Sequence, residues 1–514
     1  MRNRSPYSIA SSLAVWAFTV LGFAMSAMAA PLFEASVHLD LGRDCGQRIG
    51  TLFEVVDANG HVLFGAGASD IHSLYTRANN RTLDFYYKAE DFRSTIEVVG
   101  KPFGPDRNAS CLILDSNKLL TYFRGGVPVQ LKEVKEGGFE PYDGLTGMQA
   151  EKFNGLQFVD NRRIVFAGNN VWLGDEIAYQ PERPALYYFV NGKLYVYLND
   201  APQKLWIYDW DPTSQTQVKG TPEQFDVAGT LFVFGAYNDE VFISSNIGNN
   251  YAYKSGELRT IRASDGTSWQ GYAVSYWYDE LWIGHYPSGS IYGYRGKDLA
   301  LITPPVPRAP GAIDANREAQ IFGFYGGDLY VGVWPWGELW RLDCNSRQWS
   351  LAGRVFHSPV IDGNDVPYRD AMQGKPGDYN LWGQRIMNLV GTSHGLYIST
   401  MNKRGDAWDP AVYDFLTPEV VSQYGAIHRL TGPAQASGQI VWKPSTTFRF
   451  VCDREGLFIY QDAALLAKHA IQIPEDFANR IPAAIRLGKG VYGPLTGRVI
   501  NCTARVLEAP LKQE

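Results

Sequence analysis

Apolar and polar residues alternate in short runs along most of the chain. The stretch "LWIGHYPSGSIYGY" at residues 281–294 returns as "LYVGVWPWGELWRL" at residues 329–342. In both stretches an alternating run ends in an aromatic–Pro–x–Gly turn and a second alternating run follows it. A period of two is typical of strands with one buried face, so each stretch predicts a β-hairpin. Helical periodicity is almost absent, and only residues 417–423 and 463–469 predict short helices.

The hairpin pattern recurs at intervals of 40 to 67 residues. The second strands of the clearest units begin at Leu194, Val241, Leu281, Leu329 and Leu396, and weaker units lie around residues 111–131 and 156–173. A period of this size in a strand-rich chain indicates a β-propeller. A single blade cannot bury both of its apolar faces, whereas blades stacked in a ring bury them against each other. We therefore predict an all-β fold with a propeller of about seven blades at residues 111–444, and we expect most aromatic residues to pack between blades.

The two flanks carry a different strand pattern. The stretch "FRFVCDREGLFIYQDAALL" at residues 448–466 is followed by "AAIRLGKGVYGPLTGRVINC" at residues 483–502. These motifs resemble the closing strands of laminin-G-like, or concanavalin-like, sandwiches, and residues 33–68 resemble the opening strands. The resemblance implies one β-sandwich that is split by the propeller and formed from residues 30–110 and 445–514. The alternative is two unrelated β-extensions of the propeller.

The N-terminus has the pattern of an export signal. Arg2 and Arg4 precede an apolar run, and Ala27-Met28-Ala29 is a small-x-small cleavage site. We predict a signal peptide at residues 1–29 and a secreted or periplasmic protein without a membrane span after its removal. A retained membrane anchor is the alternative.

The composition narrows the range of ligands. A net charge of −6 disfavours nucleic acid, which requires a basic surface. The five cysteines do not have the spacing of a zinc site. Residues 362–366, "DGNDV", resemble part of a calcium loop but lack the spaced ligands and the final glutamate. We therefore expect no metal and no cofactor.

The repeated hairpins also predict on which face of the propeller a functional site lies. In a propeller, the turns between second and third strands open on one face, together with the connections into the innermost strands. In this chain the turns differ between units while the strands repeat, and long insertions occur at residues 303–318, 357–383 and 404–425. Because long loops usually carry binding sites, we predict the functional site on this insertion-bearing face.

The residues expected on this face suit a sugar chain. Aromatic rings pack on sugar rings, while amides and guanidinium groups bind hydroxyls and carboxylates. The predicted substrate-binding residues are Trp334, Trp336, Trp382, Gln384, Asn402 and Lys403. Eliminative cleavage of a uronic acid polymer needs a carboxylate neutraliser, a base and an acid. Arg385, His285 and Tyr286 have these chemistries and are the predicted catalytic residues.

Two classes of function follow from this pattern. The first is an exported carbohydrate-interacting protein that binds an acidic polysaccharide, with or without cleavage. Its resemblance to propeller-fold polysaccharide lyases rests on architecture alone. In a purely structural alternative, His285 is a turn residue, Arg385 ties blades together and the tryptophans cap the channel. The second class is a periplasmic or cell-surface scaffold for protein–protein interaction, which would show an even apolar rim instead of one polar, aromatic cleft.

Overall fold

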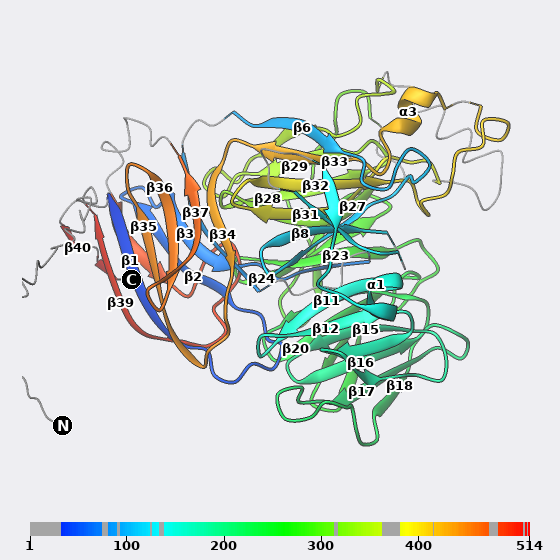
Figure 1. Ribbon diagram of the computed structural model, residues 1–514, viewed down its shortest axis with the longest axis horizontal. Coiled ribbons are helices and arrows are strands. Elements are labelled where there is room, and N and C mark those ends of the chain that lie inside the picture. The colour runs from blue at the N-terminus through cyan, green and yellow to red at the C-terminus, as the bar shows by residue number, and fades with distance from the viewer. Residues whose placement is uncertain are drawn as a thin grey trace, which may run out of the picture.

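The computed structural model describes residues 32–74, 81–89, 93–123, 126–132, 138–312, 317–361, 381–414, 416–471, 482–506, 509–510 and 512–513. The predicted signal peptide and the "DGNDV" stretch lie outside the described residues. Strands dominate the described chain and form a propeller and a sandwich that lie side by side (Figure 1). The predicted all-β fold is confirmed.

Seven antiparallel sheets, counted over the described residues, form the propeller. Blade one is β7 (Cys111–Asp115), β8 (Lys118–Tyr122), β9 (Val129–Leu131) and β10 (Phe139–Pro141). Blade two is β11 (Phe153–Val159), β12 (Arg162–Ala167), β13 (Asn170–Leu173) and β14 (Glu176–Tyr179). Blade three is β15 (Ala185–Val190), β16 (Lys193–Leu198), β17 (Lys204–Asp209) and β18 (Glu223–Asp226). Blade four is β19 (Leu231–Tyr237), β20 (Glu240–Ser245), β21 (Asn250–Lys254) and β22 (Glu257–Arg262). Blade five is β23 (Gln270–Trp277), β24 (Glu280–Tyr286), β25 (Ile291–Tyr294) and β26 (Leu299–Leu301). Blade six is β27 (Glu318–Tyr325), β28 (Asp328–Trp334), β29 (Glu338–Leu342) and β30 (Trp349–Arg354).

Blade seven is completed by a strand that precedes blade one in the chain. Its strands β31 (Arg385–Thr392), β32 (Gly395–Met401) and β33 (Ile427–Thr431) are followed in the sheet by β6 (Thr95–Gly100), which pairs with β33. The sequence placed residues 95–100 in the sandwich. They belong to the propeller because the open edge of a three-stranded blade requires a pairing partner.

Buried apolar side chains join each blade to its neighbours. Within the described chain, each of seven such clusters contains residues from at least two neighbouring blades. Between blades six and seven, for example, Ile321 and Tyr330 pack with Ile386 and Leu396. The recurring aromatic residues are thus largely packing groups, as expected.

Both flanks of the chain form the sandwich. One sheet has the order β37-β36-β35-β1-β39-β40, and the other has the order β34-β5-β3-β2-β38-β41. The N-terminal strands are β1 (Phe33–Asp40), β2 (Gly50–Asp57), β3 (Val62–Ala68) and β5 (Thr82–Tyr87). The C-terminal strands are β34 (Ala434–Gln439), β35 (Ser445–Cys452), β36 (Gly456–Gln461), β37 (Ala464–Ala470), β38 (Pro482–Leu487), β39 (Arg498–Val506), β40 (Ala509–Pro510) and β41 (Lys512–Gln513).

The pairing of β1 shows that this is one sandwich. Phe33 lies opposite Cys452 of β35 on one side and opposite Val506 of β39 on the other. The alternative of two separate β-extensions is therefore wrong. The sandwich also includes β34, which the sequence assigned to the propeller, because Ala434–Gln439 pairs with β5.

One of the two expected helices is present. Residues 417–423 contain α3 (Pro418–Ser422), and α1 (Gly147–Glu151) is a further short helix. Residues 463–469 are not helical, because Ala463 lies in a turn and residues 464–469 belong to β37. Asp462 and Ala463 have φ of 47° and 74°, which forms a tight turn and lets β37 pair back onto β36.

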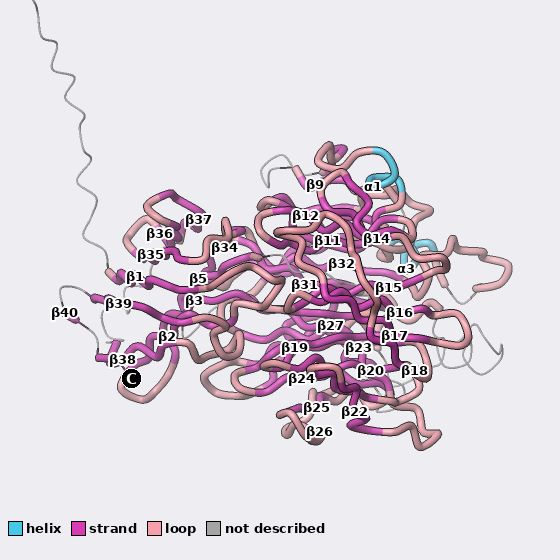
Figure 2. Tube along the Cα trace, turned by 90° about the horizontal axis from the view of Figure 1, so that it is seen from below, coloured by secondary structure: helices cyan, strands magenta, loops and turns pink. Residues whose placement is uncertain are grey.

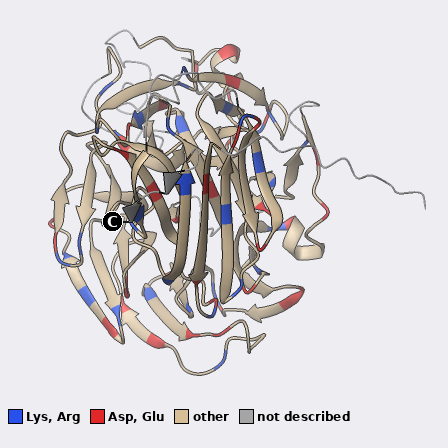
Figure 3. Cartoon of the chain, turned by 90° about the vertical axis from the view of Figure 1, so that its left-hand side faces the viewer, with Lys and Arg blue, Asp and Glu red and all other residues tan. Residues whose placement is uncertain are grey.

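Charged residues on the sandwich are of mixed sign. Strands joined by loops make up most of both domains (Figure 2). Seen from the sandwich, Lys and Arg are interspersed with Asp and Glu (Figure 3). Glu34, for example, forms ion pairs with both Arg449 and Arg505. Positive and negative side chains on these strands therefore partly offset one another.

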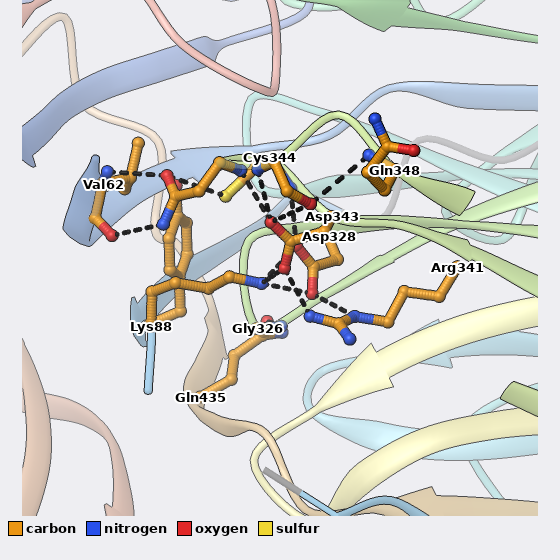
Figure 4. A network of polar contacts seen from close by, with 12 residues as sticks. Val62, Lys88, Gly326, Asp328, Arg341, Asp343, Cys344, Gln348 and Gln435 are labelled. Atoms are coloured by element: carbon orange, nitrogen blue, oxygen red, sulfur yellow. Dashed lines mark hydrogen bonds and ion pairs between the residues drawn. The ribbon is translucent and has the colours of Figure 1, made fainter. Parts of the chain in front are cut away.

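The sandwich docks on the turns between first and second strands of the blades. Lys88, which follows β5, is 3% exposed, and its Nζ lies 2.5 Å from Asp328 and 2.9 Å from Asp343 (Figure 4). Arg341 contacts both carboxylates at 2.6 Å. The two domains are therefore joined by a largely buried network of charges at blade six.

Candidate functional site

A short strand of the N-terminal flank lies inside the propeller channel. β4 (Ile71–Ser73) pairs with the innermost strand β23, with Ser73 opposite Ala273. It also contacts β19 and β27, the innermost strands of the blades on either side. The segment after β3 thus leaves the sandwich and enters the channel from the sandwich face. The sequence assigned these residues to the sandwich alone.

His72 anchors this segment in the channel. It is 3% exposed, and its Nδ1 accepts a hydrogen bond from the backbone N–H of Phe234 at 3.2 Å. Its ring lies edge-on to Tyr188, with centroids 4.8 Å apart. Leu74 follows, and its backbone N–H donates to the carbonyl of Tyr272 at 3.0 Å. The sandwich therefore contributes a side chain close to the far mouth of the channel.

A cavity of about 580 Å³ lies at this mouth, on the insertion-bearing face. It is formed mainly by the beginnings of innermost strands and by second-to-third-strand turns of blades one to three, with Thr230 before blade four and Leu74 of the channel segment. Its lining residues are Leu74, Cys111, Tyr122, Asn154, Phe166, Gly168, Asn169, Pro184, Ala185, Leu186, Tyr187 and Thr230. None of these carries a formal charge at neutral pH. The volume falls in the range of small-ligand sites, and an uncharged lining favours an uncharged part of a ligand.

Hydrogen bonds fix the polar groups of this cavity. The hydroxyl of Tyr187 donates to the carbonyl of Asn169 at 2.7 Å. The side-chain oxygen of Asn169 accepts from the backbone N–H of Ala185 at 2.9 Å. The amide of Asn154 donates to the carbonyl of Gly168 at 3.2 Å. The cavity wall is therefore preorganised, which reduces the entropy lost when a ligand binds.

A second group at the mouth is charged and belongs to blades five to seven. Arg385 begins β31 and donates from Nη1 to Oε2 of Glu318, which begins β27, at 2.5 Å. Burial and the negative charge of Glu318 raise the pKa of the half-buried Tyr286. Desolvation and the positive charge of Arg385 lower the pKa of Lys403, whose side chain is exposed. The structure thus brings together three of the predicted site residues, Tyr286, Arg385 and Lys403.

His285 is enclosed within blade five. It is 4% exposed and packs against Trp269 and Tyr292, with ring centroids 4.8 Å and 5.0 Å away. Nδ1 is hydrogen bonded to Ser288 Oγ at 2.8 Å, and Nε2 is buried without a hydrogen bond to a described residue. Burial and the charge of Arg262 lower the pKa of His285 to about 4. This placement favours the structural alternative over a base that reaches a substrate.

The repeated turns tie each blade to the next. The carbonyl of Pro287 accepts from the backbone N–H of Arg317 at 2.7 Å, where the chain enters blade six. The carbonyl of Pro335 accepts from the backbone N–H of Gln384 at 2.8 Å, where the chain enters blade seven. The same hydrogen bond at two successive junctions explains why the aromatic–Pro–x–Gly turn repeats.

The predicted tryptophans lie inside the protein. Trp334, Trp336 and Trp382 are 0%, 2% and 2% exposed. The guanidinium of Arg385 lies 5.1 Å from the ring centroid of Trp334, and Trp382 packs edge-on against Tyr424 at 5.3 Å. Their ring faces are therefore used in packing and are not open to a sugar.

The predicted amide residues are also engaged. Gln384 accepts from Arg354 at 2.9 Å and donates to the carbonyl of Ser358 at 2.7 Å. Asn402 accepts from the backbone N–H of Gly405 and donates to the carbonyl of Asp406, at 2.5 Å and 3.1 Å. Both residues are fully buried. They shape the turns beneath the insertions, and the structure does not bring them to the cavity.

Across the described residues, no group of three or more His, Cys, Asp or Glu is arranged to hold a metal ion. None of their helices is long and apolar enough to cross a membrane. All five cysteines are free thiols.

The residues that line the mouth cavity are not among the site residues predicted from the sequence. They come mainly from blades one to three, and the turns of blades one and two lack the aromatic–Pro–x–Gly signature. A signal was nevertheless present, because "FAGNN" at residues 166–170 and "RPALYYF" at residues 183–189 occupy a turn and a strand start on the predicted face.

Comparisons with known proteins give only distant resemblances. No known family matches the chain, and no curated protein matches it. The extracellular domain of a hybrid two component system of B. thetaiotaomicron is 11% identical, with a TM-score of 0.39 over 71% of this chain and 46% of that domain. BamB from Moraxella catarrhalis is 12% identical, with a TM-score of 0.31 over 77% of this chain and 96% of BamB. The WD40 β-propeller domain of Doa1 is 14% identical, with a TM-score of 0.30 over 58% of this chain and 93% of that domain.

These similarities do not indicate a function for this chain. The chain spans less than half of the B. thetaiotaomicron domain, and all three TM-scores are low. The identification of a propeller rests on the strand order within the seven blades and on their shared cores.

Proposed function

We propose that this protein binds a glycan at the channel mouth, on the face opposite the sandwich, without cleaving it. The observation that carries the proposal is the 580 Å³ cavity with its uncharged lining. Tyr122, Phe166 and Tyr187 are buried but line the cavity, and they give it an apolar wall on which the apolar face of a sugar ring can pack. The amide of the exposed Asn154 suits its hydroxyl groups.

The charged side of the mouth favours a glycan with acidic groups. Lys403 and the neighbouring Arg404 supply positive charge there, beside the buried Arg385–Glu318 ion pair, whose two charges offset each other. Lys403 and Arg404 are exposed, so their charges are available to a ligand. A chain that places one sugar in the cavity and extends across the mouth would meet this excess of positive charge.

Cleavage is less well supported than binding. A general base must come within hydrogen-bond reach of the proton that it removes. Both ring nitrogens of His285 are enclosed, one of them by Ser288. Tyr286 has a raised pKa and retains its proton at neutral pH, so it can donate a hydrogen bond but cannot act as a base there. We therefore place Tyr286 and Lys403 in binding, whereas the fully buried Arg385 holds its ion pair with Glu318.

The scaffold alternative lacks the surface that it requires. Among the described residues, the exposed large apolar side chains are spread over separate strands of both domains. They include Val98, Ile177, Leu301, Leu465 and Ile500 on β6, β14, β26, β37 and β39. Scattered apolar residues are normal on a soluble surface, whereas a docking site needs a contiguous patch.

The test is a binding screen combined with an assay for cleavage. The full mature chain would be titrated calorimetrically with neutral and acidic oligosaccharides, and the ultraviolet absorbance of unsaturated uronic products would be followed in parallel. We expect an acidic oligosaccharide to bind and no unsaturated product to form. If no oligosaccharide binds, the proposal fails. If product forms at a rate that falls in His285→Gln, the protein is a lyase and the binding-only account is wrong.

A further inference from the structure

A second cavity lies between blades five and six, on the half of the propeller that faces the sandwich. Its volume is about 350 Å³, and it is separate from the mouth cavity. One wall comes from the end of β23 and the start of β24, and the other from β29, β30 and the turn between them. We call it the blade five–six cleft.

Aromatic rings dominate the walls of this cleft. Trp277 lies 5.6 Å from Trp282 and 5.3 Å from Tyr278, measured between ring centroids. Trp349 lines the cleft from β30. Tyr278 and Trp349 are partly exposed, so parts of both side chains are accessible from solvent. Trp277 and Trp282 are buried behind them, so Tyr278 and Trp349 offer the apolar surface that a ligand can reach.

The orientation of two tryptophans is set by hydrogen bonds. Trp282 donates from Nε1 to Oε2 of Glu280 at 3.0 Å, and Trp349 donates from Nε1 to the carbonyl of Pro304 at 3.2 Å. Because these polar groups are already satisfied, what these indoles offer a ligand is their rings. The rings are held in place before a ligand arrives, which lowers the entropic cost of binding.

Charged groups of both signs surround these rings. Arg295 lies 3.3 Å from Glu280 and 3.6 Å from Asp279. The guanidinium of Arg347 lies 4.0 Å from the ring centroid of Tyr278. Two carboxylates and two guanidinium groups balance, so the cleft has no net charge to favour an ionic ligand. They provide acceptors and donors for a ligand rich in hydroxyl groups.

We propose that the blade five–six cleft is a second site, which binds a neutral saccharide. Ring faces for the C–H surface of a sugar and paired carboxylates and guanidinium groups for its hydroxyls occur together in a cavity of small-ligand size. The mouth cavity lies on the opposite face and has an uncharged lining beside a cationic group. This inference therefore does not rest on the glycan site at the channel mouth.

The test uses the full mature chain and neutral di- and trisaccharides of glucose, mannose, galactose and N-acetylglucosamine. Calorimetric titration should detect binding of at least one of them. We expect Trp349→Ala and Glu280→Gln each to weaken that binding about tenfold or more, while Trp349→Phe keeps most of it. Trp206→Ala removes a partly buried indole of β17 that lines neither cavity, and it should bind like the wild type.

The outcomes separate the two sites. If no neutral saccharide binds, or if Trp349→Ala and Glu280→Gln bind like the wild type, the proposal is overturned. It is also overturned if a bulky Ala185→Trp substitution at the mouth abolishes binding of the neutral saccharide, because the ligand then sits at the mouth. Circular dichroism and thermal unfolding of each variant would confirm that it is folded, so that a loss of binding reports on the cleft.

Discussion

Arg385 and Glu318 form a fully buried ion pair that joins blades seven and six, with Nη1 and Oε2 2.5 Å apart. Loss of one partner would leave the other charge buried alone. We therefore expect Arg385→Met to lower the free energy of unfolding by about 3–5 kcal/mol. Urea-induced unfolding of the variant and the wild type would measure the difference.

A double variant serves as the control for this pair. Glu318→Gln combined with Arg385→Met removes both charges and should recover most of the lost stability, because neither charge is then stranded. If Arg385→Met alone lowers the free energy of unfolding by less than about 1 kcal/mol, the pair stabilises the protein no more than an exposed surface ion pair does. That result would contradict its structural role.

His285 should make the protein less stable in acid. Its pKa is about 4 when folded and 6.5 when unfolded, because burial disfavours the charged ring. The unfolded chain therefore takes up this proton first as the pH falls. The stabilisation is present above pH 6.5 and is lost between pH 6.5 and 4, by up to about 3 kcal/mol.

Variants can isolate this contribution. The free energy of unfolding measured between pH 7 and pH 4 should fall less steeply in His285→Gln, whereas the exposed His61→Gln should follow the wild type. An NMR titration that shows His285 gaining its proton above pH 6 would contradict its enclosed position.

Glu54 should have the opposite effect. Burial raises its pKa from 4.5 to about 7, although it accepts a hydrogen bond from the backbone N–H of Val491 at 2.9 Å. The folded protein holds this proton more tightly than the unfolded chain. Stability should therefore fall as the pH rises from 4.5 to about 7, by up to about 3 kcal/mol. Glu54→Gln should flatten this decline in pH-dependent unfolding, and an unchanged slope would show that Glu54 is ionised throughout.

Lys88 should couple the sandwich to the propeller. Lys88→Met leaves Asp328 and Asp343 with one cation fewer, and we expect the free energy of unfolding to fall by about 3–5 kcal/mol. Differential scanning calorimetry would measure this and would show whether the two domains then unfold separately. The matched control is Lys443→Met, which breaks a half-exposed pair with Asp462 and should cost less than about 1 kcal/mol. Equal losses in both variants would contradict a special role for Lys88.

The sequence predicted the elements whose packing recurs. Every blade must bury two apolar faces, so the alternating pattern returns at each blade and can be read without a structure. Strands β4 and β6 were missed for a physical reason. Ile71–Ser73 and Thr95–Gly100 are short, and they pair with strands about 200 and 330 residues away. Such pairing depends on which edge remains open in the folded protein.

The sequence indicated which residues lie at strand ends and turns better than it indicated how their side chains are covered. Alternation shows that Trp334 ends a strand, but it does not show what covers the ring. In the structure a Cβ at Gly383 would lie 1.9 Å from the indole nitrogen of Trp334, so the chain entering blade seven lies directly against it. That contact depends on the path of the insertion at residues 357–383. The lining of the mouth cavity likewise depends on how blades one to three meet around the channel.

The central claim is that the mouth cavity holds the ligand, and a cavity-filling variant tests it most directly. Ala185 is a partly exposed lining residue at the start of β15, so Ala185→Trp should fill the space that a sugar ring would occupy. Ala263→Trp adds the same side chain at an exposed position outside the cavity. In calorimetric titrations with the tightest-binding acidic oligosaccharide, we expect Ala185→Trp to lose at least about tenfold in affinity and Ala263→Trp to bind like the wild type. Equal affinities of Ala185→Trp and the wild type would contradict the claim.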